Sequence, residues 1–259
     1  MSRRAGVAHV VTLALVLVAL VGSSSPAAHP DRPPEALDLL ASAHATSAEP
    51  SVAEAAFDVT RVRGADVEAD TAAIASSTCD QCVSESTALH VVFAARPRQV
   101  RLDNVANAWA QGCTACGSTA LSVQVVVLRG HPDAHPNNRA VALNAACDTC
   151  RTSALAFQVV LVADDAAPLG RAELAALRAW VDAQAAALRA SVAQPDPAGT
   201  TTPEPTPDPT ETATPTPRAG STSARRARRD AATALDDLTA LLVAAVGVEP
   251  VSADVEVSR

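Results

Sequence analysis

The sequence CDTCRTSALAFQVVLV occupies residues 147–162 and decides the fold of this chain. After the two cysteines, Leu155 and Phe157 alternate with the small residues Ala154 and Ala156, so large and small side chains fall on opposite faces of an extended segment. A period of two indicates a β-strand, and the two residues between the cysteines fit a tight turn. The stretch therefore predicts a turn followed by a strand.

The same pattern occurs three times along the chain. Cys-x-x-Cys pairs begin at Cys79, Cys113 and Cys147, with a spacing of 34 residues, and the neighbouring positions align without gaps. This internal triplication predicts a mainly β domain over residues 57–165, in which three strand-turn-strand repeats form a sheet or a solenoid. The aligned positions are Leu89, Val123 and Phe157 after the cysteines, with Ala72, Ala106 and Ala140 before them, and Ser76, Ala110 and Asn144 next to them.

The small face of the repeated strand carries one larger polar side chain in each unit, namely His90, Gln124 and Gln158. Alanine and serine around these positions would let a second layer of structure approach closely. If the repeats lie in register, the polar side chains would stack as a ladder of amides. The alternative is that they face solvent from a half-exposed strand, and the sequence leaves both interpretations open.

The N-terminal segment predicts export. Arg3 and Arg4 precede an apolar run from Val10 to Val21, and small residues follow as far as Ala27. This is the pattern of a secretory signal peptide over residues 1–27, and the run is shorter than a membrane-spanning helix. We therefore expect a protein that is secreted or associated with the cell surface.

The remaining segments flank the repeats. Leu37, Leu39 and Leu40 predict an N-terminal helical segment, and a stripe of leucines and valines predicts an amphipathic helix after the repeats. A tract rich in proline and threonine has almost nothing to bury and predicts a disordered linker. The expected order is a helical segment at 28–56, the repeats at 57–165, a helix at 166–194, the linker at 195–223, a C-terminal helix at 224–247 and a tail at 248–259.

Composition limits the function classes. The chain has 259 residues, a net charge of −8 and only 2% aromatic residues, so it lacks the basic face and stacking rings that favour nucleic-acid binding. All 20 basic residues are arginines, which excludes chemistry that needs a lysine Schiff base or a Walker lysine. No His-Glu-x-x-His, Gly-x-Ser-x-Gly or phosphate-binding glycine loop occurs. No catalytic residue is therefore indicated.

The pattern Asn-x-x-Cys-x-x-Cys-x-Thr/Ser-x-Ala-x-Ala-x-Gln, clearest from Asn144 to Gln158, resembles a repeat of exported or membrane-associated proteins of high-GC Gram-positive bacteria. Some of these proteins are named peptide zinc metalloproteases. The resemblance covers roughly residues 100–190, and the first repeat departs from it at Ser76 and His90. It implies no established activity, because the protease name belongs to a region with His-Glu-x-x-His that this chain lacks.

Three chemistries suit the cysteines. In an exported chain we favour disulfides, and the repeat symmetry favours a bond inside each pair. Thiolate binding of zinc by neighbouring pairs is the alternative, although His131 and His135 lie in a proline-flanked loop and are not expected to be ligands. Thiol-disulfide exchange is a second alternative, which the neighbouring Asp80 and Asp148 disfavour by raising thiol pKa values. The six residues concerned are Cys79, Cys82, Cys113, Cys116, Cys147 and Cys150.

These observations predict an exported, non-enzymatic repeat protein with a structural or binding role at the cell surface. No cofactor is expected unless the cysteines hold zinc. The sequence does not identify a partner; another surface or membrane protein would suit the location, and nucleic acid would not. It also does not settle whether the C-terminal helix packs on the repeat domain.

Overall fold

The computed structural model describes residues 35–193 and 220–259. The predicted signal peptide at 1–27 and most of the predicted linker at 195–223 lie outside these residues. The part described is mainly β, as the sequence predicts, and contains a β-solenoid of about four turns with two flanking helices. Neither described helix is both long and apolar enough to cross a membrane.

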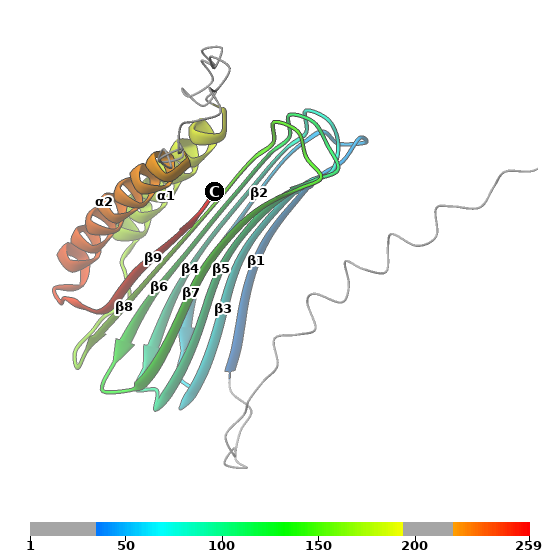
Figure 1. Ribbon diagram of the computed structural model, residues 1–259. Helices are drawn as coiled ribbons and strands as arrows, with labels where there is room; N and C mark the ends of the chain where they lie inside the picture. Colours follow the sequence, from blue (N-terminus) through cyan, green and yellow to red (C-terminus); the bar gives the residue numbers. More distant parts are fainter. Residues whose placement is uncertain (1–34, 194–219) are drawn as a thin grey trace, which may run out of the picture. The chain divides into compact units, whose positions relative to one another are not determined.

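Eight strands wind into four coils, and each coil contributes one strand to each of two sheets (Figure 1). Within each sheet, the strands of successive coils pair in parallel. The open sheet has the order β1-β3-β5-β7, and the helix-covered sheet has the order β2-β4-β6-β8-β9. The first to fourth coils are β1–β2, β3–β4, β5–β6 and β7–β8. The bounds are β1 Glu35–Ala45, β2 Ser51–Val62, β3 Asp66–Ser77, β4 Val83–Ala95, β5 Gln99–Gln111, β6 Gly117–Arg129, β7 Asp133–Ala145 and β8 Arg151–Ala163.

Alanine fills much of the space between the two sheets. Ala73 and Ala106 of the open sheet and Ala120 and Ala154 of the helix-covered sheet belong to one buried cluster. Because these side chains are short, the facing strands approach closely, which is what the small face of the repeat predicts. Larger side chains such as Leu102 and Leu128 continue this layer in a second buried cluster.

The other face of the helix-covered sheet packs against α1 (Arg171–Ala193) and α2 (Gly220–Val246). The ring of Phe157 on β8 meets the ring of Trp180 on α1 edge to face, with centroids 5.0 Å apart. Each helix contributes one buried stripe, so α2 is part of the hydrophobic core and is not an independent module. The buried stripes are Leu177, Val181 and Leu188 on α1 and Ala231, Ala234, Leu238 and Leu242 on α2.

The chain returns from α2 to the sheet through Gly247, whose φ of 79° ends the helix in the left-handed region that glycine favours. The amide of Gly247 donates to the carbonyl of Val243 at 2.8 Å. Strand β9 (Pro250–Ser258) then pairs antiparallel with β8, so Figure 1 shows it at the edge of the helix-covered sheet. The predicted tail is therefore a strand that covers the last coil.

The predicted helical segment at 28–56 is wrong, because its described part forms β1 and the first half of β2. The adjacent Leu39 and Leu40 suggested a helix, yet Leu37, Leu39 and Ala41 are the more buried positions and alternate with the exposed residues Asp38 and Leu40 at period two. Pairing with β3 overrides the helix propensity of the alanines in this segment. The solenoid consequently has a fourth, cysteine-free coil, β1–β2, which begins before the predicted boundary at residue 57.

Candidate functional site

The three cysteine pairs lie in the turns that lead from the open sheet to the helix-covered sheet, so they share one end of the solenoid. In each turn the Sγ atoms of one Cys-x-x-Cys pair are close together, and all six cysteines have such a partner. The third residue of each motif is left-handed, with φ of 60° at Gln81, 54° at Ala115 and 53° at Thr149. The three turns therefore repeat one backbone geometry that brings the sulfur atoms of a pair together.

Backbone hydrogen bonds stack these turns on one another. The amide of Gln81 donates to the carbonyl of Thr114 at 2.8 Å, and the amide of Ala115 donates to the carbonyl of Asp148 at 2.8 Å. The amide of Asp148 also donates to the carbonyl of Cys113 at 3.1 Å. The ladder of the sheets thus continues through the cysteine turns and fixes their spacing.

The second coil is one residue out of step with the later coils at this end. Ser77 pairs with Ala110, although the sequence alignment places Ser76 there. One residue separates Ser77 from Cys79, whereas two residues separate Ala110 from Cys113. The gap-free upstream alignment is therefore wrong: Ala73, and not Ala72, is the partner of Ala106.

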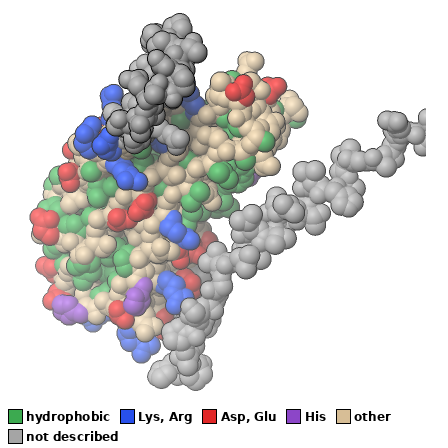
Figure 2. Space-filling view, in the orientation of Figure 1, with side chains coloured by type: hydrophobic (Ala, Val, Ile, Leu, Met, Phe, Trp, Pro, Cys, Tyr) green, Lys and Arg blue, Asp and Glu red, His purple; other side chains and the backbone are tan. Residues whose placement is uncertain are grey.

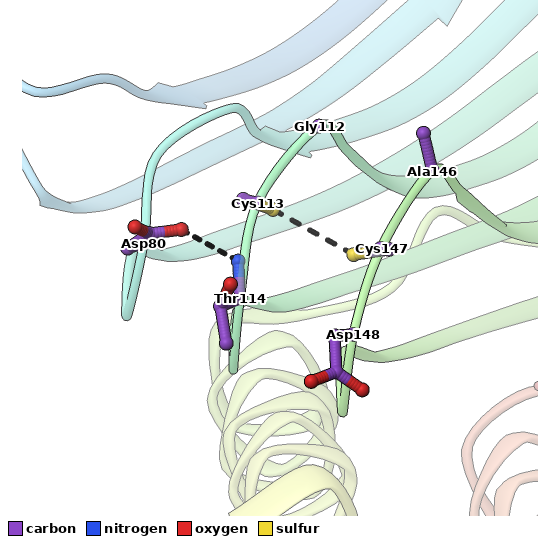
Figure 3. Close-up of a pocket in the computed structure, with 7 residues that line it drawn as sticks. All are labelled: Asp80, Gly112, Cys113, Thr114, Ala146, Cys147 and Asp148. Atoms are coloured by element: carbon purple, nitrogen blue, oxygen red, sulfur yellow. Dashed lines mark hydrogen bonds between the residues drawn. The ribbon is translucent and has the colours of Figure 1, made fainter.

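The additional residue gives the third and fourth coils the same approach to the turn. Gly112 and Ala146 both precede a cysteine and both have positive φ, 63° and 49°. The two turns are consequently in register, and Figure 3 shows the side chains of Cys113 and Cys147 pointing toward one another. Their Sγ atoms are 3.7 Å apart, and the Sγ atoms of Cys113 and Cys150 are 3.8 Å apart.

Four sulfur atoms therefore form one group, which we call the sulfur quartet. Cys113, Cys116, Cys147 and Cys150 have Sγ atoms that all lie within 4.8 Å of one another. Cys113 and Cys116 are buried, while Cys147 and Cys150 are half-buried. Among residues 35–193 and 220–259 this is the group of metal-ligating side chains that the geometry brings together.

The turns border a shallow hollow of about 470 Å³ that is open to solvent. Asp80 and Asp148 line it together with Cys113 and Cys147 (Figure 3). The carboxylate of Asp80 accepts a hydrogen bond from the amide of Thr114 at 2.7 Å, so it links the cysteine turn of the second coil to that of the third coil. The hollow places the edge of the sulfur quartet within reach of small solutes.

His131 and His135 are not part of this group, because they lie where β6 ends and β7 begins, at the opposite end of these strands from the cysteine turns. His131 lies between β6 and β7 with its Nε2 atom 3.3 Å from Asp164, and His135 lies on β7 with its Nε2 atom 3.3 Å from Asp133. Both side chains are exposed. Each histidine has its own carboxylate partner on the surface. The predicted loop is wrong for His135, because pairing with β5 places it in a strand.

The ladder residues His90, Gln124 and Gln158 occupy neighbouring strands in register and are buried between the sheets. The amide of Gln158 donates to Oε1 of Gln124 at 2.8 Å. Nε2 of Gln124 donates to the carbonyl of Ala69 at 2.9 Å and to Oγ1 of Thr71 at 3.1 Å. These bonds cross from one sheet to the other, so the polar row joins the two layers.

His90 replaces glutamine at the N-terminal end of this row. Its Nδ1 atom is 3.1 Å from Oγ1 of Thr71. Burial lowers the pKa of His90 below its ordinary value of 6.5, and the charges of Asp58 and Asp38 act in the opposite direction. The lowered pKa favours the neutral ring at this buried position.

A second polar row escaped the sequence analysis. Asn104 and Asn138 are paired neighbours in the open sheet, and the side chain of Asn104 donates to Oδ1 of Asn138 at 2.8 Å. Asn104 also accepts from Oγ of Ser122 at 2.6 Å, and Asn138 donates to Oδ2 of Asp254 at 3.0 Å. The 34-residue spacing of the two asparagines was the available signal.

The outer face of the open sheet carries a row of carboxylates and several apolar side chains. Asp38, Asp70 and Asp103 are paired neighbours in register. Partial burial, together with the charges of Asp103, Asp38 and Glu68, raises the pKa of Asp70 from 3.8 to about 6. The same face exposes Leu40 and Leu143, at 59% and 57%. Figure 2 shows acidic, basic and apolar side chains intermixed over the visible surface.

Replacing Asp70 by asparagine is expected to stabilise the domain at neutral pH. A raised pKa in the folded state means that the ionised carboxylate opposes folding above pH 6, and this penalty fades as the pH falls toward 4. The gain stays below about 1 kcal/mol, because Asp70 is exposed and screened. Urea unfolding at pH 7.5 and 4.5 measures the difference.

The matched control is Asp66→Asn on the same strand. Asp66 has Arg98 at 3.6 Å, so losing its charge removes an attraction. This variant is not expected to gain stability at either pH. Equal effects of the two substitutions, or a gain for Asp70→Asn that persists at pH 4.5, would contradict the repulsion inferred for the carboxylate row.

Comparison of the whole chain with protein-family models, with curated proteins and with solved structures finds no match. The function proposed below is therefore argued from the residues and geometry of this chain.

Proposed function

We propose that the chain is an exported, non-enzymatic scaffold with a structural or binding role at the cell surface, and that a disulfide closes the cysteine turn of each of its last three coils. The observation that carries this proposal is the close pairing of sulfur atoms within each of the three stacked turns. The Cα atoms of the pairs are 5.3, 6.2 and 5.8 Å apart, within the usual range for disulfides.

The energetic need for such bonds follows from the core. Alanine contributes little apolar area compared with leucine or phenylalanine, so the layer between the sheets provides modest stabilisation per residue. A bond across two intervening residues contributes about 2 kcal/mol by limiting the unfolded chain. Three such bonds at one end of the coils would offset part of what the alanine layer lacks.

The scaffold presents the outer face of the open sheet. The helices α1 and α2 cover the corresponding face of the other sheet, and this leaves the face with Leu40, Val141 and Leu143 exposed. The in-register pairing of β1, β3, β5 and β7 makes this face repetitive. A repetitive surface suits a structural or binding role better than it suits a catalytic pocket.

Peptide mapping of the exported protein under non-reducing conditions tests the proposal. We expect three peptides, each containing one Cys-x-x-Cys pair and each lighter by two hydrogens than its reduced form. Alkylating reagents are expected to label no cysteine until a reductant is added. Free thiols in all three pairs, or bonds between different turns, would contradict the proposed scaffold, and retention of the chain inside the cell would contradict export.

A further inference from the structure

We propose that the reduced form of the sulfur quartet binds one soft divalent cation, with zinc as the natural example, in a tetrahedral four-thiolate site between the third and fourth coils. The scaffold role proposed above needs only the closed pairs, so this inference goes beyond it. The site uses Cys113, Cys116, Cys147 and Cys150 and excludes Cys79 and Cys82.

The first argument is the spacing between the turns. In a zinc site with Zn–S bonds of about 2.3 Å, the sulfur atoms of the tetrahedron are about 3.8 Å apart. Sγ of Cys113 lies 3.7 Å from Sγ of Cys147 and 3.8 Å from Sγ of Cys150. The backbone thus already holds the sulfur of Cys113 at the edge length of the tetrahedron from both sulfur atoms of the next turn, and all four sulfur atoms lie within 4.8 Å of one another. The separations within each pair must open.

The second argument is preorganisation of the backbone. The turns that carry the quartet are joined by the bond from Asp148 to Cys113 at 3.1 Å and by the bond from Arg151 to Cys116 at 2.9 Å. A metal ion would therefore find its four ligands on two fixed turns. It would not have to assemble them from a flexible chain, and the ordering entropy that opposes binding is reduced.

The third argument is the asymmetry among the three pairs. Cys79 follows Ser77 after one residue, whereas the later pairs follow their paired positions after two. The turn of the second coil, which carries Cys79 and Cys82, is consequently displaced relative to the next turn. The sulfur of Cys116 lies 3.3 Å from the carbonyl of Cys79 and does not approach its sulfur. A four-thiolate site uses only two of the three cysteine pairs. The register explains why the pair left out is Cys79 and Cys82.

The site forms in two steps, reduction of the two disulfides and then binding of the cation. Opening the two disulfides takes four electrons and four protons, which a phosphine or dithiol reductant supplies while it is itself oxidised. Binding of the cation then releases the four thiol protons, because thiolates are the ligands. Zinc changes no oxidation state in this step, and loading is expected to weaken as the pH falls.

The test uses the full chain, reduced with a phosphine without oxygen, freed of reductant and titrated with Zn²⁺ or Co²⁺. We expect one metal per chain by elemental analysis and, with Co²⁺, the visible absorption of a tetrahedral tetrathiolate. Removing two of the four ligands in Cys113→Ser/Cys147→Ser should weaken binding by more than about 100-fold. The matched control Cys79→Ser/Cys82→Ser should still bind one metal per chain.

Far-UV circular dichroism shows whether the reduced chain keeps its β-structure. If reduction unfolds it, stoichiometric Zn²⁺ is expected to restore the signal in the wild type and in Cys79→Ser/Cys82→Ser but not in Cys113→Ser/Cys147→Ser. No bound metal, or equal losses in the two double variants, would overturn the inference. Because peptide mapping uses the unreduced protein, a failure of the scaffold proposal is distinguishable from a failure of the metal site.

Discussion

Replacing Gln124 by methionine is expected to destabilise the domain by about 2–4 kcal/mol, because the substitution keeps the volume and removes the amide that joins the two sheets. Gln124 is fully buried. Its Nε2 atom donates to Ala69 and Thr71, and its Oε1 atom accepts from Gln158. The variant leaves the buried amide of Gln158 without that acceptor, so its desolvation cost is less well compensated.

Chemical unfolding of the two proteins at pH 7 measures the loss. The control is Gln111→Met, the same substitution at an exposed position near the end of β5, where we expect a change within about 0.5 kcal/mol. A similar small effect at Gln124 would mean that water reaches this layer. It would also contradict the inference that the hydrogen bonds of Gln124 join the two sheets.

Ending the chain after Gly247 is expected to cause self-association. Strand β9 covers the edge of β8, and without it the outward-facing amides and carbonyls between Ala154 and Leu161 become available to a second chain. Val255 and Val257 also pack against the core shared with the helices, so their removal uncovers apolar surface. Light scattering during size-exclusion chromatography at micromolar concentration should show a larger assembly than the full chain forms.

A pair of proline variants separates pairing from chain length. Val255 lies opposite Phe157 in the regular part of the β8–β9 ladder, whereas Val251 lies in the irregular part and is 63% exposed. Val255→Pro is expected to reproduce the association, because proline cannot donate to a ladder, and Val251→Pro is not. Unchanged assembly size in both the truncated chain and Val255→Pro would show that β9 does not protect the edge.

The strands of the repeats were predictable because valine and leucine alternate with small residues at a period of two, which is the period of a strand and not of a helix. Leu155 and Phe157 are examples, and they do face a hydrophobic core on one side of β8. The small face suggested that a second layer could approach, but the sequence left open whether polar residues on it, such as Gln124 and Gln158, are buried or face solvent. In the structure both faces of β8 are in the core, and its polar residues are structural.

The first coil was missed for a physical reason. The segment Glu35–Ala45 is rich in alanine and leucine, which are intrinsically good helix formers, and it lacks the cysteines that mark the other coils. Its strand conformation is supplied by pairing with β3, which is information that lies outside the segment. Local preference is a weak guide where a neighbouring strand provides a template.

The register of the second coil shows a similar limit at the candidate site. The spacing of the cysteines is constant, so an alignment without gaps was natural. In the structure, Ser77 and Cys79 are separated by one residue fewer than Ala110 and Cys113. The positions of β3 are therefore shifted by one residue from the alignment that the cysteines give. A shift of one residue exchanges the two faces of a strand, so Ala73 rather than Ala72 enters the core.

Because the first coil lies at one end of the solenoid, the two ends of the domain are expected to respond differently to a pulling force. In a solenoid each coil is held mainly by its neighbours, so a coil with a neighbour on one side only is the weakest link. Within residues 35–193 and 220–259, β8 is covered by β9, whereas β1 and β2 have pairing partners on one side. Tension applied at Glu35 would peel the coils away one after another, while tension applied at Ser258 would have to shear the whole β8–β9 ladder at once. Pulling at the N-terminal end would therefore unfold the domain coil by coil, whereas pulling at the C-terminal end would meet the resistance of the whole ladder in a single step.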